Sequence, residues 1–181
     1  MQKAGPAGPA AAPAVAAPVL PTTITYADVQ RFSPGRTNFT LEPSWWAIKG
    51  GHLNAYASAT TQTIQGTIAT IPVTITFVPA EYVWSWGDGT TLTTTTGGAS
   101  WGELGLPDWS PTETSHVYES RGDVQVSLTV RYSATVTGQG RTIPVTGLVA
   151  APATSAPVRV VESHRALVAA DCLVDPHGPG C

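Results

Sequence analysis

The chain has 181 residues, a length that suits one domain of ordinary size with extensions at its ends. Hydrophobic residues make up 42% of the chain and exclude full disorder, whereas charged residues make up 12%, about half of the ~25% usual in soluble domains. The net charge of -3, with lysine only at Lys3 and Lys49, gives no basic surface for nucleic acid or anionic membrane. No uninterrupted apolar run reaches the length of about 18 residues that a membrane-spanning helix needs.

The first 21 residues consist almost wholly of alanine, proline, glycine and valine. Their repeated prolines would break the continuous helical run that a secretory signal needs. We expect residues 1–21 to form an extended, semi-rigid linker or tail ahead of the folded domain.

From Thr22 onward, short apolar alternations are separated by glycine and proline, without a helical period longer than about two turns. The expected elements, in chain order, are a strand at 22–26, an irregular crossing at 28–36, an extended piece at 38–41, strands at 62–68, 73–78, 82–86 and 124–131, a hairpin of 132–137 and 142–149, a loop at 150–157, and final strands at 158–161 and 166–168. Many short strands joined by turns are typical of an all-β sandwich or barrel.

Two of these strands indicate which side chains form the core. In 124–131, valine and leucine alternate with polar residues, the clearest pattern of a half-buried strand in the chain. In 82–86, the two-residue period places Tyr82, Trp84 and Trp86 on one face.

The residues at the end of the 82–86 strand resemble a known family. Trp-Ser-Trp-Gly-Asp-Gly-Thr at 84–90, His-Val-Tyr at 116–118 and Gly-Asp-Val-Gln-Val-Ser-Leu-Thr-Val at 122–130 follow the order of three motifs of the polycystic kidney disease (PKD) domain. The match spans about residues 67–131. It implies an immunoglobulin-like antiparallel β-sandwich with extra flanking strands. The whole chain is also similar to small secreted proteins of high-GC Gram-positive bacteria that carry such a domain.

The resemblance assigns structural roles to the motif residues. Trp84 matches the family's core tryptophan, and Tyr118 is placed like a tyrosine corner whose hydroxyl bonds back to the chain. Asp88 should accept backbone N–H groups in a turn where the flanking glycines take positive φ. The full structural motif comprises Trp84, Trp86, Gly87, Asp88, Gly89, His116, Tyr118 and Gly122.

Four tryptophans outside the motif are the best functional lead. Trp45 and Trp46 lie in a turn, and Trp101 and Trp109 lie in a long glycine-rich insertion between residues 89 and 116 that departs from the family pattern. A tryptophan held on a loop offers a flat apolar face that can stack on a sugar ring. The alternative, which we favour, is that the insertion folds back as a lid and buries these side chains.

The sequence gives no strong signal for a metal ion, a cofactor or catalysis. Asp88 in a Gly-Asp-Gly turn is more typical of a capped turn than of a calcium ligand, because calcium needs about six or more oxygen ligands. The four histidines lack the spacing of zinc ligands, and no nucleophile elbow, Cys/His dyad or phosphate-binding loop is present. No pair of facing carboxylates can be nominated for glycoside hydrolysis. We therefore expect no cofactor, no metal and no enzyme activity.

Cys172 and Cys181 are the only cysteines and enclose a short loop at the C-terminal end of the chain. They are either free thiols in a reducing compartment or a disulfide in an oxidising one, and we favour the disulfide. In the chain-entropy model such a loop is stabilised by about 2.7 kcal/mol, which makes it a local clasp.

These observations predict a linker or tail at 1–21, a PKD-like sandwich at 22–168 and a cysteine-closed tail at 169–181. The expected function is a non-catalytic module for protein interaction or spacing, extracellular or at the bacterial cell surface. Two alternatives remain, a carbohydrate-binding module that uses the loop tryptophans and, less favoured, a hydrolase. The expected partner is accordingly an unidentified protein or polysaccharide of the cell surface.

Overall fold

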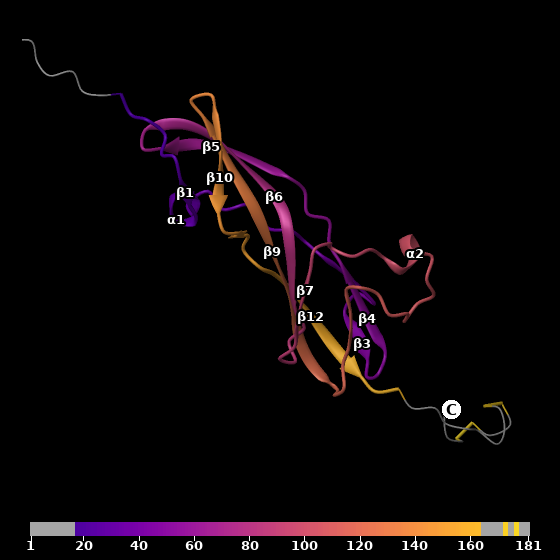
Figure 1. Cartoon of the computed structure of the whole chain (residues 1–181). Helices are drawn as coiled ribbons and strands as arrows, with labels where there is room; N and C mark the ends of the chain where they lie inside the picture. The colour runs from indigo at the N-terminus through magenta and orange to yellow at the C-terminus, as the bar shows by residue number, and fades with distance from the viewer. Residues whose placement is uncertain (1–16, 164–171, 174–175, 178–181) are drawn as a thin grey trace, which may run out of the picture.

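The computed structural model describes residues 17–163, 172–173 and 176–177, and within them the chain is an all-β protein of two sheets and two short helices (Figure 1). The predicted all-β, two-sheet fold is confirmed. The elements in chain order are β1 (Ile24–Thr25), α1 (Tyr26–Val29), β2 (Thr40–Glu42), β3 (Trp46–Ile48), β4 (His52–Tyr56), β5 (Gln62–Ile68), β6 (Ile71–Ser85), β7 (Thr91–Thr94), α2 (Trp101–Leu104), β8 (Ser115–Val117), β9 (Gly122–Gly138), β10 (Arg141–Thr146), β11 (Val149–Ala150) and β12 (Thr154–Val161).

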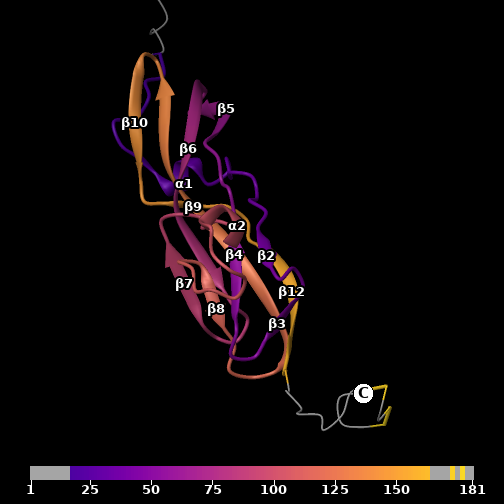
Figure 2. The ribbon, with the colours of Figure 1, turned by 90° about the vertical axis from the view of Figure 1, so that its right-hand side faces the viewer.

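Two long antiparallel strands, β6 and β9, run along the elongated molecule. Their pairing extends from Thr74 opposite Thr137 to Ser85 opposite Ser127. At one end of the molecule β5 flanks β6, while β10 and then β1 flank β9. At the other end β7 flanks β6, while β12 and then β3 flank β9 (Figure 2). Together with β11, these strands form one nine-stranded sheet.

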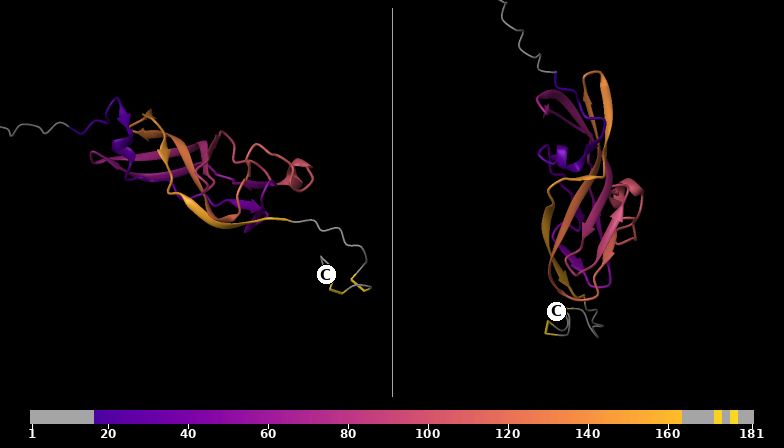
Figure 3. Two further views of the ribbon diagram at one scale, coloured as in Figure 1. Left: turned by 90° about the horizontal axis from the view of Figure 1, so that it is seen from below. Right: turned by 60° about the vertical axis from the view of Figure 1, so that its left-hand side comes forward.

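The second sheet consists of β2, β4 and β8 and packs on the end of the molecule that carries β7 and β12. Side chains of this sheet and its flanking residues contact Trp84 of β6 and Trp86, which follows β6. His116 of β8 stacks on Trp86 with ring centroids 4.9 Å apart, and Phe39, just before β2, contacts Trp84 edge-on at 5.6 Å. Figure 3 shows α2 projecting from the side of the molecule at this end.

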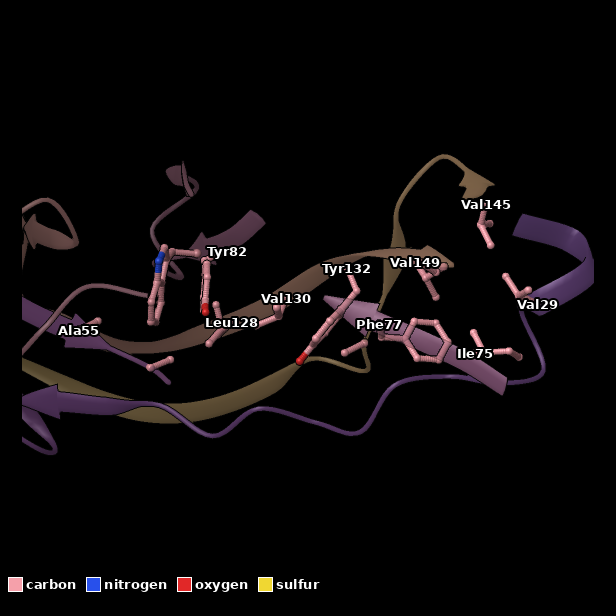
Figure 4. Close-up of a cluster of buried hydrophobic side chains, with 14 of the residues drawn as sticks. Val29, Ala55, Ile75, Phe77, Tyr82, Leu128, Val130, Tyr132, Val145 and Val149 are labelled. Atoms are coloured by element: carbon pink, nitrogen blue, oxygen red, sulfur yellow. The ribbon is translucent and has the colours of Figure 1, made fainter. Parts of the chain in front are cut away.

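One continuous core joins both ends of the molecule. Figure 4 shows its side chains in a row along β6 and β9, from Ala55 and Leu128 near the small sheet to Ile75 and Val29 near α1. Each buried side chain of this size contributes about 1.5–3 kcal/mol by removing apolar surface from water. The alternation in the sequence of β9 correctly predicts core positions, because Val126, Leu128 and Val130 are all buried.

The structure corrects several expected strand boundaries. The expected strands at 73–78 and 82–86 are one strand, because the chain passes through a bulge between Pro79 and Glu81 and does not turn there. The expected strands at 124–131 and 132–137 are likewise the single strand β9, since buried and exposed residues continue to alternate across their junction.

The structure also differs from the expected elements at the start of the first helix, at the start of β12 and in several short strands. Tyr26 begins a helix and does not end a strand, because Thr25 donates its N–H and hydroxyl to Asp28 and caps the helical turn. Residues 154–157, expected in a loop, pair with β9 as the start of β12. The strands β4, β7 and β8 were not expected, since none of these short segments has an alternation long enough to indicate a strand.

Some expectations fall on residues that the structure does not describe. These are most of the 1–21 segment, the strand at 166–168 and Cys181, so the linker and the Cys172–Cys181 disulfide stay predictions. Among the residues that are described, no helix is long and apolar enough to cross a membrane.

Candidate functional site

The PKD-like motif residues gather where β6 ends and β8 approaches it. Trp84 and Trp86 are buried and stack with ring centroids 6.1 Å apart. Tyr118 is also buried, and its hydroxyl donates a hydrogen bond of 2.9 Å to the backbone oxygen of Trp86, as a tyrosine corner would. Burial raises the pKa of Tyr118, so the hydroxyl keeps the proton that it donates. These three buried side chains support the fold.

Asp88 occupies the turn after β6, where Gly87 and Gly89 have positive φ of 81° and 94°. Its Oδ1 accepts the Thr90 N–H at 3.0 Å and the Thr90 hydroxyl at 2.6 Å, and its Oδ2 lies 2.6 Å from His116 Nε2. Partial burial of the carboxyl opposes ionisation, but the hydrogen bonds from Thr90 and His116 outweigh it and lower the pKa of Asp88 to about 2. The carboxylate thus caps its own turn, as the sequence predicted.

This depressed pKa makes the stability of the turn sensitive to acid. A carboxyl whose pKa is lower in the folded state contributes stability that is present above its unfolded pKa, near 3.8, and is lost as the pH falls toward 2. We expect Asp88→Asn to lower the melting temperature at neutral pH and the difference from wild type to shrink between pH values of about 5 and 2. Thermal melts followed by circular dichroism measure this, and a constant difference across that range would contradict it.

A groove on the side of the molecule brings together three of the four loop tryptophans. It has a volume of about 410 Å³ and lies where the α2 insertion meets β2 and β3. We call it the tryptophan groove, and its lining residues are Leu41, Glu42, Pro43, Ser44, Trp46, Trp101, Asp108 and Trp109.

A buried amide fixes the insertion to the small sheet beneath the groove. Asn54 of β4 is fully buried, and its Nδ2 donates to Ala99 O at 2.9 Å and to Glu42 Oε2 at 3.0 Å. Its Oδ1 accepts the Thr112 hydroxyl at 2.6 Å. Because Ala99 and Thr112 lie on either side of α2, the one side chain holds both ends of the insertion. The groove is therefore built on an ordered support.

The tryptophans of the groove form a connected row. Trp109 lies between Trp46, with ring centroids 5.5 Å apart, and Trp101, at 6.1 Å. Trp101 is buried, and it donates its backbone N–H to Glu42 Oε2 at 2.9 Å and its indole N–H to Ser110 O at 2.9 Å. Trp109 has a φ of 69°, a backbone conformation that costs a bulky residue about 1–2 kcal/mol. A strained backbone conformation of this kind persists only where the surrounding contacts fix the residue, as the two neighbouring tryptophan rings do for Trp109.

The four tryptophans thus differ in what they can offer a ligand. Trp101 is only 4% exposed, so the expected burial of the loop tryptophans by the insertion is confirmed for this residue. Its indole forms part of the groove wall. Trp46 and Trp109 are partly exposed and present ring surface to the groove. Trp45 is 65% exposed but lies outside the groove lining. Trp46 belongs to β3, although the sequence placed it in a turn.

Sequence reasoning missed three residues of this site. Glu42, Asn54 and Asp108 lie in three separate segments of the chain, and no motif or spacing in the sequence connects them. The tertiary structure places Glu42 and Asp108 at the lining of the groove and Asn54 beneath it. Within the described ranges, no three histidine, cysteine or acidic side chains are grouped to hold a metal ion.

The groove combines flat apolar rings with hydrogen-bond acceptors. Glu42, Asp108 and Ser44, whose side chains carry acceptor oxygens, line it together with Trp46 and Trp109. Trp109 also lines a second cavity of about 450 Å³, bounded by Ile48 and residues 49–51, so its side chain is shared by two cavities. A scan against protein-family models found no match, and a search of curated proteins found no similar sequence.

Proposed function

We propose that this protein is a non-catalytic extracellular binding module whose tryptophan groove recognises a neutral saccharide chain. The observation that carries the proposal is the partly exposed pair Trp46 and Trp109, which lines one groove together with the acidic residues Glu42 and Asp108. The apolar face of a pyranose ring stacks on an indole, and its hydroxyls donate to carboxylates. Secretion is supported by the PKD-like motifs and the cysteine pair in the sequence.

Glu42 supports a binding role over a catalytic one. Its Oε2 accepts both the Asn54 amide and the Trp101 backbone N–H, contacts that hold the insertion in place. A general acid must carry a proton and deliver it to the ligand, whereas this oxygen is occupied by two donors. Glu42 therefore has a structural role in the groove, which supports binding over cleavage.

The test is binding of the whole chain to peptidoglycan, cellulose and chitin by co-sedimentation, with soluble fragments of each followed by calorimetry. We expect Trp109→Ala to weaken binding by at least about tenfold, the effect of removing a central aromatic anchor. Trp46→Ala should weaken it similarly. Trp45→Ala is the matched control, because Trp45 is exposed and lies outside the groove.

Circular dichroism must show that each variant is folded. Binding that is lost in Trp109→Ala and kept in Trp45→Ala supports the groove. Equal binding by all variants, or no binding by wild type to any of the polysaccharides, contradicts it. Release of reducing ends from a bound saccharide would contradict the non-catalytic role.

A second candidate function, a spacer or protein-interaction module, is favoured by the shape of the molecule. The first and last residues of the 17–163 segment lie at opposite ends of the long axis (Figures 1 and 3). A domain with this arrangement holds the segments attached to its two ends apart by the length of its long axis. A surface protein that is captured equally by wild type and by a Trp46→Ala/Trp109→Ala double variant would favour this candidate.

A further inference from the structure

The strand β5 forms an unusually open edge of the large sheet. It has seven residues and is the longest strand of the described chain that is paired on one side only, by β6. Figure 2 shows it on the side of β6 away from β10. Proteins usually protect such an edge with charged residues, proline or a bulge, and β5 contains none of these.

The pairing pattern shows which backbone groups of β5 are free. Ala69 and Thr70, which join β5 to β6, have φ of 47° and 71°, as in a two-residue type I′ hairpin. Such a turn makes Ile68 and Ile71 a hydrogen-bonded pair, and bonded pairs then recur at every second position. The N–H and C=O groups of residues 63, 65 and 67 therefore point away from β6.

Contacts at the edge agree with this assignment. The guanidinium of Arg31 donates to the backbone oxygen of Thr67, so that oxygen does point outward. The backbone N–H and C=O groups of Thr63 and Gln65 have no hydrogen-bond partner among the described residues. Thr63 and Gln65 therefore each present one free N–H donor and one free C=O acceptor along the edge of the sheet.

The two faces of β5 continue those of the sheet. On the outer face the side chains of Thr63 and Gln65 are polar and exposed. On the inner face Ile64 is partly buried against the core, and the ring of Phe32 lies so close over Gly66 that an added Cβ would come within 2.2 Å of it. Phe32 thus keeps this glycine-containing strand ordered and ready to pair.

We propose that β5 pairs with β5 of a second copy of this chain, antiparallel about a two-fold axis at Ile64. In this register Thr63 of each copy lies opposite Gln65 of the other, and all free backbone groups of both residues are hydrogen-bonded. Ile64 lies opposite Ile64 of the second copy at a closely spaced pair, which covers its exposed apolar part. The Arg31 contact to Thr67 is left intact.

A second copy fits this edge because a two-fold interface must complement itself. Residues 63–65 complement themselves in three ways: their donors meet acceptors, Ile64 meets Ile64, and none of the three residues carries a charge that would face the same charge of the second copy. The contact is small, so the dimer is transient and depends on concentration. The α2 insertion lies far from β5 in Figure 1, so the dimer would leave both tryptophan grooves free; this last point rests on the proposed function.

Sedimentation velocity of the whole chain over a range of concentrations tests the dimer. Gln65→Pro removes an outward N–H without removing a bond to β6, and Thr63→Lys places positive charges on both sides of the two-fold axis. Each should raise the dissociation constant by at least about tenfold, because Gln65→Pro removes one of the two hydrogen bonds in both Thr63–Gln65 pairs and Thr63→Lys adds like charges across the axis. The matched control Thr142→Lys changes the opposite flank of the sheet and should dimerise like wild type.

Cysteine cross-linking tests the register independently of saccharide binding. Ile64→Cys should form a covalent dimer on mild oxidation, because the two residues face each other, whereas Thr67→Cys should not, because its copies lie far apart. A wild-type chain that stays monomeric at all concentrations overturns the proposal. A dimer unaffected by Gln65→Pro, or cross-linked equally by both cysteine variants, overturns it as well.

Discussion

Replacing Trp84 with alanine is expected to lower the free energy of unfolding by about 3–5 kcal/mol, the usual cost of deleting a buried tryptophan. Trp84 is fully buried at the contact between the two sheets, where it touches Phe39 and Trp86. The cavity left behind cannot collapse easily, because β6 is held by strands on both sides. Urea unfolding followed by circular dichroism at fixed pH measures the loss.

Two further substitutions make this result specific. The indole N–H of Trp84 is buried without a hydrogen-bond partner in the described chain, so Trp84→Phe removes a desolvated donor and should cost much less than alanine. Trp45→Ala should change stability by no more than about 0.5 kcal/mol, because Trp45 is mostly exposed. Equal losses for Trp84→Ala and Trp45→Ala would show that the two sheets do not meet at Trp84.

The second large effect is expected from Gly97→Ala, at the start of the insertion. A Cβ on Gly97 would lie 1.8 Å from the backbone oxygen of Ala57, and Ala57 donates its N–H to Gly97 O at 2.9 Å. Neither backbone can move without breaking this bond. Overpacking of this kind costs about 1–3 kcal/mol or more, and we expect the upper end.

Gly97→Ala should also weaken ligand binding, because its segment leads into Ala99 and the support of the tryptophan groove. The matched control is Gly102→Ala in α2, where an added Cβ meets nothing within 4 Å and alanine suits a helix better than glycine. Unfolding and saccharide binding are measured for both variants. A Gly97→Ala variant as stable as Gly102→Ala would contradict the close contact between Gly97 and Ala57, the residue that follows β4.

Local patterns in the sequence determined much of the fold. The two-residue alternation of apolar side chains marked β5 with correct ends and most of the buried positions of β6 and β9, because alternation in a strand depends only on neighbours in the chain. The roles of Asp88 in its turn and of Tyr118 as a tyrosine corner came from the family resemblance and not from alternation. The continuity of β6 through its bulge was not, since Pro79 resembles a strand end until a partner strand is known.

Only the tertiary structure decided the candidate site. The chain segments that carry Glu42, Trp46 and Trp109 are far apart in sequence, and their meeting depends on the buried hydrogen bonds of Asn54. Which tryptophan is buried and which is exposed depends on how the insertion folds over β2 and β3, and no periodicity encodes that. The sequence by itself determined β5 and most buried positions of β6 and β9, because these follow from local alternation. The groove and the free edge of β5 follow from long-range pairing, which local patterns do not specify.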